Sequence, residues 1–364
     1  MMLARRNLAH DRIRLVLSVV GVALSVMLIL LLSGYLAGIY RQASAYLEHT
    51  EGSTIVSQKG VRTFAGSSSF LSSDVLEAVR RTPGVERSIP IVMQSAVLEL
   101  HERKEIASLV GYETEAGGGP WDLASGREPA ADDEVVVDRV LADQHGIALG
   151  DRVRILDREV TVVGLSNGTS MWIGSYIFAP AETVQALVRA PGTWSAIFVT
   201  PSAGVSDAAL GDRISLPGVE AYTKTDKIES DRKGISRIYD APLGLMVGIA
   251  FVVGVLVVGL VIYTATVERR REYGALKAIG MRNRTLYRLV ASQALMAALA
   301  GASLGVALAY GLGALLVTWR PQFPVVIEPG AVAAALLASL AMALLAALLP
   351  ARAMAGLAPA EVFR

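Results

Sequence analysis

Cysteine is absent from this chain, and histidine is scarce. The 364 residues contain no cysteine and only four histidines. Without cysteine there is no structural disulfide, no cysteine-based zinc site and no thiol redox chemistry. The histidines are isolated from one another and no H-E-x-x-H sequence occurs, so we expect no metal centre and no catalytic residue of that type.

A phosphate-binding loop of the form G-x-x-x-x-G-K-[ST] is also missing. Because that loop cradles the phosphates of ATP, we do not expect this chain to bind ATP itself. The sequence GGGP at 117–120 lacks the lysine and the helix start that a phosphate site needs, so we expect a flexible loop there. No cofactor is therefore expected within this chain.

Charged side chains are missing from four long apolar segments. Residues 15–40, 241–266, 289–318 and 330–350 contain no Asp, Glu, Lys, Arg or His. At about 1.5 Å of helix per residue, each is long enough to cross a hydrocarbon core of about 30 Å. The composition agrees, since 53% of residues are hydrophobic. The sequence predicts four transmembrane helices in a lipid bilayer; a cleaved signal peptide at 15–40 is disfavoured because no small-residue cleavage site follows the run.

Basic residues are concentrated beside one set of span ends. Segments 1–14, 267–288 and 351–364 together hold thirteen Lys or Arg and four Asp or Glu, and the rest of the chain is net acidic. The positive-inside rule places these segments, and so both termini, in the cytoplasm. We expect a multi-pass protein of the cell inner (plasma) membrane. The net charge of +1 gives no indication of a nucleic-acid partner.

Residues 41–240 and the short loop 319–329 are then expected outside the membrane. In 41–240, β-branched runs alternate with short helical ones. The fold class is therefore an α-helical membrane protein with four transmembrane helices and a large α+β extracytoplasmic domain between spans 1 and 2. The expected strands are 53–57, 92–100, 134–137, 152–156, 159–165, 175–178 and 196–200, and the expected helices are 73–82, 139–145, 181–188 and 207–214.

One short sequence occurs twice in this outer domain. LEAVRRTPGVE at 76–86 and LGDRISLPGVE at 210–220 each predict a helix stopped by Pro-Gly and followed by a strand. Chance identity is one explanation. The explanation we favour is a βαβ-like platform formed by 50–100 and 201–225, with 101–200 inserted as a second, strand-rich lobe. The flanking segments 40–48 and 223–239 have helical composition and are expected to continue the spans as a stalk.

The spans hold no ionisable side chain other than tyrosine. A proton-coupled pump needs carboxylates or histidines in the membrane, and an intramembrane serine protease needs a base beside its serine. Neither is expected, so any transport must draw its energy from another chain.

The cytoplasmic segment between spans 2 and 3 reads VERRREYGALKAIGMRNRTLYR. A positively charged anchor that only fixes topology needs arginines alone. Here Tyr273, Leu276 and Ile279 add an apolar stripe, and Gly274 and Gly280 interrupt the run. A short amphipathic helix offered to a cytoplasmic partner explains these additional features.

The sequence 268–280, ERRREYGALKAIG, resembles the E-R-x-R-E-φ-G-x-φ-[KR]-A-φ-G motif of ABC transporter permeases of the MacB/FtsX type. The ending PARAMAGLAPAEVFR (350–364) is similar to the P-x-x-x-A-x-x-x-x-P-x-E-x-φ-R ending of that family. Residues 126–155 and 159–165 are similar to its outer-domain pattern, and 293–310 to its third span. The resemblance covers nearly the whole chain and corresponds to a small four-span member.

This resemblance implies a permease that forms a homodimer and binds two copies of a separate ABC ATPase, which would hold ATP and Mg²⁺. The permease would not itself be an enzyme. Motion transmitted along the stalk would export or extract a hydrophobic or amphipathic substrate, with an extracytoplasmic partner as a further expectation. Carried over by position, the ATPase-docking residues are Glu268, Arg269, Arg271, Glu272, Gly274, Lys277 and Gly280.

Small residues recur at four-residue spacing in the spans, as in close helix packing. Packing within one chain and a seam between two chains are equally compatible with this spacing. The expected packing residues are Gly301, Gly305, Ala309, Gly313, Gly34 and Gly38, with a further pair at Gly244 and Gly248.

Two other functions remain open at the level of sequence. The first is an FtsX-like regulator that transports nothing and activates a cell-wall hydrolase through its outer domain. The second is a membrane sensor with no ATPase partner. The size of the outer domain favours the transporter over the division regulator.

Overall fold

The computed structural model describes residues 12–64, 69–100, 103–268, 271–272, 274–275, 279, 281–320 and 322–355. The chain forms two compact units, which are described separately below. The membrane unit comprises Met1–Gly38, Tyr239–Trp319 and Val325–Arg364, and the outer unit comprises Ile39–Ile238 with Arg320–Pro324.

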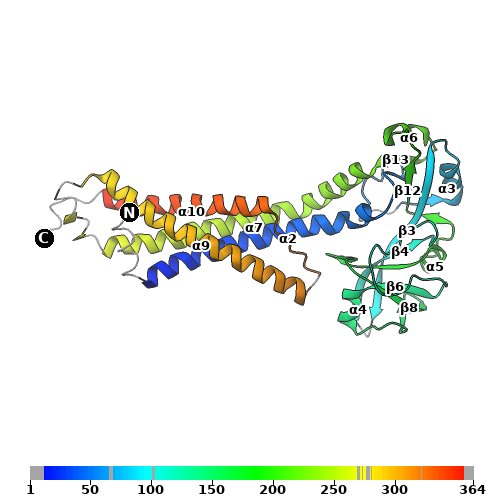
Figure 1. The fold of residues 1–364 in the computed structure, drawn as a ribbon, viewed down its shortest axis with the longest axis horizontal. Coiled ribbons are helices and arrows are strands. Elements are labelled where there is room, and N and C mark those ends of the chain that lie inside the picture. The colour runs from blue at the N-terminus through cyan, green and yellow to red at the C-terminus, as the bar shows by residue number, and fades with distance from the viewer. Residues whose placement is uncertain are drawn as a thin grey trace. The chain divides into compact units, whose positions relative to one another are not determined.

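Among the described residues, four long helices are apolar enough to cross a membrane, which confirms the four expected spans. They are α2 (Arg12–His49), α7 (Lys224–Glu268), α9 (Asn283–Trp319) and α10 (Pro329–Ala355) (Figure 1). Two of them extend well beyond the apolar runs. Helix α2 continues to His49, and α7 begins at Lys224 and passes through Pro242 without a break. These polar extensions are the stalk segments of the two helices.

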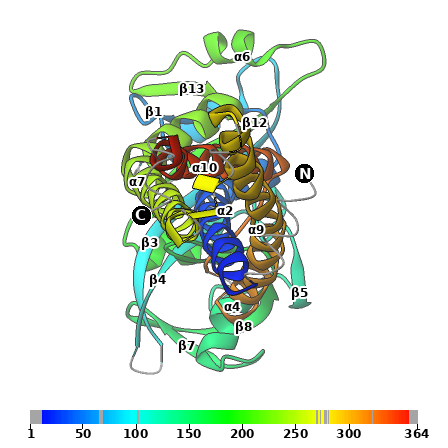
Figure 2. The ribbon, with the colours of Figure 1, turned by 90° about the vertical axis from the view of Figure 1, so that its left-hand side faces the viewer.

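The long helices of the membrane unit form a bundle (Figure 2), and small residues lie where they contact one another. Ala298 and Ala302 of α9 and Ala343 of α10 belong to one buried cluster and are each at most 1% exposed. Helix α7 packs on two neighbours through Gly254, where an added Cβ would lie 2.7 Å from both Ser25 Oγ of α2 and Met342 Sδ of α10. Because helix association in lipid depends on close packing, these alanines and glycines define how the helices fit together.

Within its described residues, the outer unit contains one eleven-stranded sheet, a separate pair of two-residue strands and four short helices. The main path of the sheet runs β13-β1-β12-β3-β4-β10-β6-β8-β5, with β7 paired to β8 and β9 to β10. The strands are β1 (Thr54–Gln58), β2 (Leu71–Ser72), β3 (Val85–Leu100), β4 (Arg103–Tyr112), β5 (Leu123–Gly126), β6 (Glu134–Asp138), β7 (Arg152–Ile155), β8 (Arg158–Ser166), β9 (Ser170–Met171), β10 (Gly174–Pro180), β11 (Thr193–Trp194), β12 (Ala196–Pro201) and β13 (Val219–Thr223). The helices are α3 (Ser73–Arg80), α4 (Arg139–His145), α5 (Ala181–Leu187) and α6 (Asp207–Arg213).

The two ends of the outer unit meet in a four-stranded platform. Its order β13-β1-β12-β3 is antiparallel throughout, with α3 between β1 and β3 and α6 between β12 and β13. This is the split βαβ arrangement of ferredoxin-like folds. Strand β12 lies between β1 and β3, so residues 196–200 belong to the platform and not to the inserted lobe in which the sequence placed them. The ferredoxin-like motif requires this placement, because β12 is the strand that pairs with β1 on one side and with β3 on the other.

The remaining strands form a lobe that continues the same sheet. Strand β3 pairs with β12 through its first half and with β4 along its second half. Strand β4 then pairs in parallel with β10, and β6 in parallel with β8. The lobe is therefore joined to the platform through the uninterrupted strand β3.

Each face of this sheet buries its own core. Val56, Leu109, Ile177 and Ile197 belong to the cluster that includes residues of α3, α4, α5 and α6. Their neighbours in sequence, among them Ile55, Val110, Tyr176 and Phe198, belong to a second cluster with Tyr46 and Leu47 of α2. Successive side chains of a strand point to opposite faces, which explains why the two clusters alternate residue by residue.

Candidate functional site

The segment predicted to dock an ATPase follows the end of α7. Arg271, Glu272, Gly274 and Ala275 are helical, and Ile279 N–H donates a 3.1 Å bond to the Ala275 carbonyl. Arg271 and Glu272 are exposed, and Ile279 is 84% exposed. A short helical stretch with a solvent-facing isoleucine is thus present. The predicted docking residues Arg269, Lys277 and Gly280 lie outside the described residues, as do Tyr273 and Leu276.

Glu268, the first predicted docking residue, is the last residue of α7. Its carboxylate forms an ion pair with the Arg14 guanidinium of α2. The Glu268 side chain remains 59% exposed in this pair. One carboxylate oxygen is engaged within the chain, and the side chain is still accessible to a second partner.

The predicted packing residues of α9 contact the same chain. An added Cβ at Gly301 would lie 2.6 Å from Val22 Cβ of α2, and one at Gly305 would lie 2.6 Å from the Ala23 carbonyl oxygen. Ala309 is fully buried. These contacts leave no space for a side chain at the two glycines, so α2 packs against α9 along this stripe.

Two further predicted residues border the segment before α10. Added Cβ atoms at Gly34 and Gly313 would lie 3.2 and 3.3 Å from Val325 Cγ1. The Val326 N–H donates a 2.9 Å bond to the Gly34 carbonyl oxygen. Gly38, the remaining member of the set, is buried. The second half of the loop 319–329, which was expected outside the membrane, therefore packs against α2.

Gly244 and Gly248 of α7 differ from these residues. Both are exposed, and an added Cβ at either position would meet nothing within 4 Å. Leu245, Ile249 and Leu256 near them are 66%, 54% and 61% exposed. This face of α7 is apolar and is open within the single chain.

An aromatic cluster surrounds the end of α2 in the outer unit. Tyr46 is fully buried and stacks on Phe64 with a ring separation of 5.4 Å. Its ring also lies 5.6 Å from Tyr176 and 6.1 Å from Phe198, which come from two strands of the sheet. Burial raises the pKa of the Tyr46 hydroxyl well above its usual value, so this group remains a hydrogen-bond donor. The cluster fixes the last turns of α2 to the sheet.

The GGGP sequence, which was expected to form a flexible loop, is a loop that packs against this cluster. The Gly118 carbonyl accepts a 2.7 Å bond from the Tyr46 hydroxyl. An added Cβ would lie 2.4 Å from Ile91 Cδ1 at Gly118, and 2.5 Å from the Tyr112 ring at Gly119. Glycine is present here because the backbone approaches buried side chains, and at Gly118 because φ is +89°.

A buried carboxylate organises the lobe. Asp138 is fully buried and caps α4 by accepting a 3.3 Å bond from Leu141 N–H. It also accepts bonds from the hydroxyls of Thr169 (2.7 Å), Ser170 (2.8 Å) and Ser175 (3.0 Å). The carboxylate thus joins β6, α4, β9 and β10 through hydrogen bonds, the condition under which a buried charge is tolerated.

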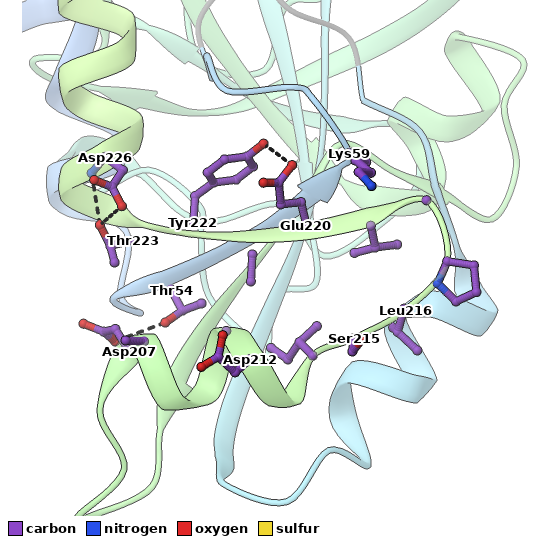
Figure 3. Close-up of a pocket in the computed structure, with 17 residues that line it drawn as sticks. Thr54, Lys59, Asp207, Asp212, Ser215, Leu216, Glu220, Tyr222, Thr223 and Asp226 are labelled. Atoms are coloured by element: carbon purple, nitrogen blue, oxygen red, sulfur yellow. Dashed lines mark hydrogen bonds between the residues drawn. The ribbon is translucent and has the colours of Figure 1, made fainter.

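A cleft of about 660 Å³ lies on the platform and contains several acidic side chains (Figure 3). Most of these carboxylates already have local partners. Asp207 accepts from Ser53 and Thr54, Glu220 from the Tyr222 hydroxyl at 2.6 Å, and Asp226 from the Thr223 hydroxyl at 2.7 Å. Asp207 thereby joins α6 to β1, whereas Glu220 and Asp226 bond to neighbours in sequence. The described residues contain no group of three or more His, Cys, Asp or Glu suited to a metal ion.

Four spans with an α+β domain between the first two define a multi-pass membrane protein. Two family descriptions match the chain in succession. The MacB-like periplasmic core domain matches residues 15–215, and the FtsX-like permease C-terminal domain matches residues 244–359. The chain therefore belongs to the MacB/FtsX-type ABC transporter permeases.

Two relatives that match over most of their length are described as ABC transporter permeases. An uncharacterized ABC transporter permease of Mycobacterium tuberculosis is 26% identical over 366 residues, covering 99% of this chain and 98% of that protein. One from Mycobacterium bovis is 26% identical and covers 89% of this chain and 87% of that protein. The macrolide export ATP-binding/permease protein MacB of Shewanella oneidensis is 26% identical over 83% of this chain, but only 50% of MacB is covered.

Solved structures resemble this chain in part. The periplasmic region of MacB from Actinobacillus actinomycetemcomitans matches 49% of this chain and 92% of its own, at 15% identity and a TM-score of 0.38. The extracellular domain of the transporter YknZ from Gram-positive bacteria matches 47% of this chain and 100% of its own, at 12% identity and a TM-score of 0.37.

Proposed function

We propose that this chain is the membrane subunit of an ABC transporter whose separate ATPase docks on residues 268–280. ATP-driven movement of that ATPase would pass along α2 and α7 to the outer unit and would export or extract a hydrophobic or amphipathic substrate. The observation that carries this proposal is the continuity of α7. One helix links the predicted docking segment at Glu268 to Lys224 beside the platform strand β13.

The proposal divides the transporter into this membrane subunit and a separate ATPase. Its MacB relative is an ATP-binding/permease protein of which only half is matched. The chain itself has no G-x-x-x-x-G-K-[ST] sequence. In this proposal the ATP-binding part of the transporter is a separate chain, which would hold ATP and Mg²⁺.

The second stalk helix supports transmission as well. Helix α2 begins at Arg12 and ends at His49, and Tyr46 near its end is fully buried among aromatic rings of the outer unit. Because a close-packed core transmits displacement, a movement of this end of α2 would move the outer unit with it.

A homodimer with two ATPase copies is part of the same proposal. The stripe on α9 is occupied by α2 of the same chain, whereas Gly244 and Gly248 have open space beside them. A second copy of α7 packing there would use a Gly-x-x-x-Gly surface suited to close contact. We assign the dimer seam to this face, in an inner membrane with both termini in the cytoplasm.

Co-purification with the cognate ABC ATPase, combined with measurement of its ATP hydrolysis, tests the docking assignment. Glu268→Ala and Gly280→Pro are expected to abolish permease-stimulated hydrolysis. Arg284→Ala is the matched control, because Arg284 is an exposed arginine in the first turn of α9 outside the docking set. If a chain with residues 268–280 replaced by a Gly/Ser linker still captures the ATPase, the assignment is wrong.

The dimer seam is tested separately by native mass spectrometry or cross-linking in lipid nanodiscs. Gly248→Leu is expected to shift the population toward monomer. Gly311→Leu is the control, since Gly311 is also an exposed span glycine with nothing within 4 Å of an added Cβ. Equal dimer fractions in the two variants would remove Gly248 from the seam.

A further inference from the structure

Residues 57–64, which comprise the end of β1 and the segment after it and are called the strap here, contact both stalk helices within the outer unit. Lys227 of α7 donates a 2.8 Å bond to the Ser57 hydroxyl and a further bond to the Val61 carbonyl. Asp231, one turn further along α7, accepts a 2.8 Å bond from Phe64 N–H. One face of α7 thus holds the strap backbone at two points spaced one helical turn apart.

The same strap holds α2 through an aromatic side chain. The Phe64 ring stacks on Tyr46 of α2 with an interplanar angle of 10°. It also meets Phe198 of β12 edge-on at 5.7 Å. Phe64 therefore bonds to α7 with its backbone and packs on α2 and on the sheet with its side chain.

The two charged residues of α7 that bind the strap are buried. Buried charged groups are unusual as the partners of an ordinary surface loop. Lys227 is 1% exposed and Asp231 is 4% exposed. The Lys227 ammonium lies 4.6 Å from the centre of the Tyr222 ring, a cation–π contact with β13. Buried lysine and aspartate are tolerated only where partners satisfy them, and the strap supplies partners to both.

We propose that the strap ties α2 and α7 into a single lever at the outer unit, with Lys227 and Asp231 as the positioning residues on α7 and Phe64 as the contact on α2. This inference rests on the proposed function for its purpose, since a permease driven from one end needs its two stalk helices to move together. The strap itself is defined by contacts that involve no ATPase.

The absence of native cysteine makes a cross-linking test direct. A Cβ added at Gly234 would lie 4.0 Å from Thr63 Cγ2, which is within reach of a disulfide between the two positions. The pair Thr63→Cys with Gly234→Cys is expected to cross-link completely under mild oxidation. The control pair Thr63→Cys with Lys233→Cys is expected not to, because Lys233 is exposed on a different side of α7. Equal cross-linking of both pairs would overturn the placement of the strap.

Spin labels measure whether the strap couples the helices. Arg41 of α2 and Arg237 of α7 are exposed and belong to the outer unit, so cysteines placed there can be labelled in the full chain. Pulsed electron resonance is expected to give one narrow distance distribution. Asp231→Leu, which removes the acceptor for Phe64 N–H, is expected to broaden it at least about twofold.

Conservative and control variants separate coupling from general destabilisation. Asp231→Asn keeps an acceptor oxygen and is expected to retain the narrow distribution. Glu229→Leu, which removes an exposed carboxylate of α7 paired only with Lys233 in the described contacts, is expected to do the same. If Asp231→Leu gives the same width as these two variants, the strap does not couple the helices.

The two proposals fail in different ways. The spin-label experiment uses the permease alone, so its outcome decides the strap whether or not an ATPase docks. An unmodified chain that fails to stimulate its ATPase would overturn the proposed function while leaving the strap measurement intact.

Discussion

The Tyr46 hydroxyl donates a 2.7 Å hydrogen bond to the Gly118 carbonyl and joins the end of α2 to the glycine loop of the outer unit. Tyr46→Phe removes this donor and leaves a carbonyl unpaired, with an expected cost of about 1–2 kcal/mol. Tyr46→Ala also empties a buried ring site and is expected to cost about 3–5 kcal/mol. Thermal unfolding of the detergent-solubilised chain would measure both, and equal stability of the two variants would contradict the packing role.

Asp138 is expected to be essential for the stability of the lobe. Asp138→Ala leaves a helix cap and the hydroxyls of Thr169, Ser170 and Ser175 without their acceptor. Loss of a buried network of this kind is expected to cost about 3 kcal/mol or more. Asp138→Asn keeps one acceptor oxygen and is expected to cost less. Hydrogen exchange of β6 and β10 would locate the effect, and unchanged exchange in Asp138→Ala would rule it out.

Lys227 is expected to give the outer unit a pH-dependent stability. Burial lowers the pKa of Lys227 to about 8, although Asp231 of α7 and Glu220 of β13 oppose that shift; Tyr222 of β13 also faces the ammonium. An unfolded lysine has a pKa of about 10.4, so between the two values the unfolded chain binds more protons and stability rises with pH. The full effect is at most roughly 3 kcal/mol.

Melting temperatures of wild type and Lys227→Met between pH 7 and 10 would test this sign. Wild type is expected to gain stability relative to Lys227→Met as the pH rises through 8. Lys233→Met, which alters an exposed lysine of the same helix, is expected to follow wild type. A relative loss of wild-type stability over this range would show that the site favours the charged lysine.

The Glu268 carboxylate pairs with Arg14 within the chain and is also proposed to bind the ATPase. Mutation of Arg14 separates these two roles. Arg14→Ala breaks the contact within the chain but leaves Glu268 available to the ATPase. We expect Arg14→Ala to retain ATPase capture and Glu268→Ala to lose it. A surface ion pair contributes only about 0–1 kcal/mol, so neither change should unfold the membrane unit. Equal loss of capture in both variants would show that the pair, and not Glu268 alone, forms the docking surface.

Close approach at Gly305 predicts a steric defect in the membrane unit. An added Cβ there would lie 2.6 Å from the Ala23 carbonyl oxygen, and backbone cannot move aside easily. Gly305→Ala is expected to lower the melting temperature of the chain in detergent. Gly311→Ala on the same helix has open space and is expected to leave it unchanged. A stable Gly305→Ala variant would show that α2 is not seated on α9 at this point.

Local patterns in the sequence were enough to predict many elements of the fold. Helix α4 occupies Arg139–His145, as expected, because Asp138 caps its start and Gly146 ends it in a left-handed conformation with φ of 64°. Strand β4 was missed because its first residues, Arg103 to Glu105, are charged. Its conformation is decided by pairing with β3 and β10, which no local pattern reports.

In the candidate site, too, local features could be predicted from the sequence and long-range contacts could not. The docking segment was recognisable because its motif is contiguous from Glu268 to Gly280. Tyr46 with Gly118, and Asp231 with Phe64, are far apart in the sequence and carry no local signal of contact. The glycines of GGGP did give a signal, but glycine marks close packing as well as flexibility, and only the structure distinguishes the two.

The register of β1 with β13 has a mechanical consequence. Thr54 pairs with Thr223 at the end of the ladder next to both stalk helices, since α2 ends at His49 and α7 begins at Lys224. Pulling the two helices apart would load this ladder in an unzipping geometry, in which hydrogen bonds break one after another instead of sharing the force. Pulling both helices in the same direction avoids that peeling load. The outer unit is therefore suited to follow a movement of both helices in the same direction, and it resists their separation poorly. A contact that holds the two helices together would prevent that separation.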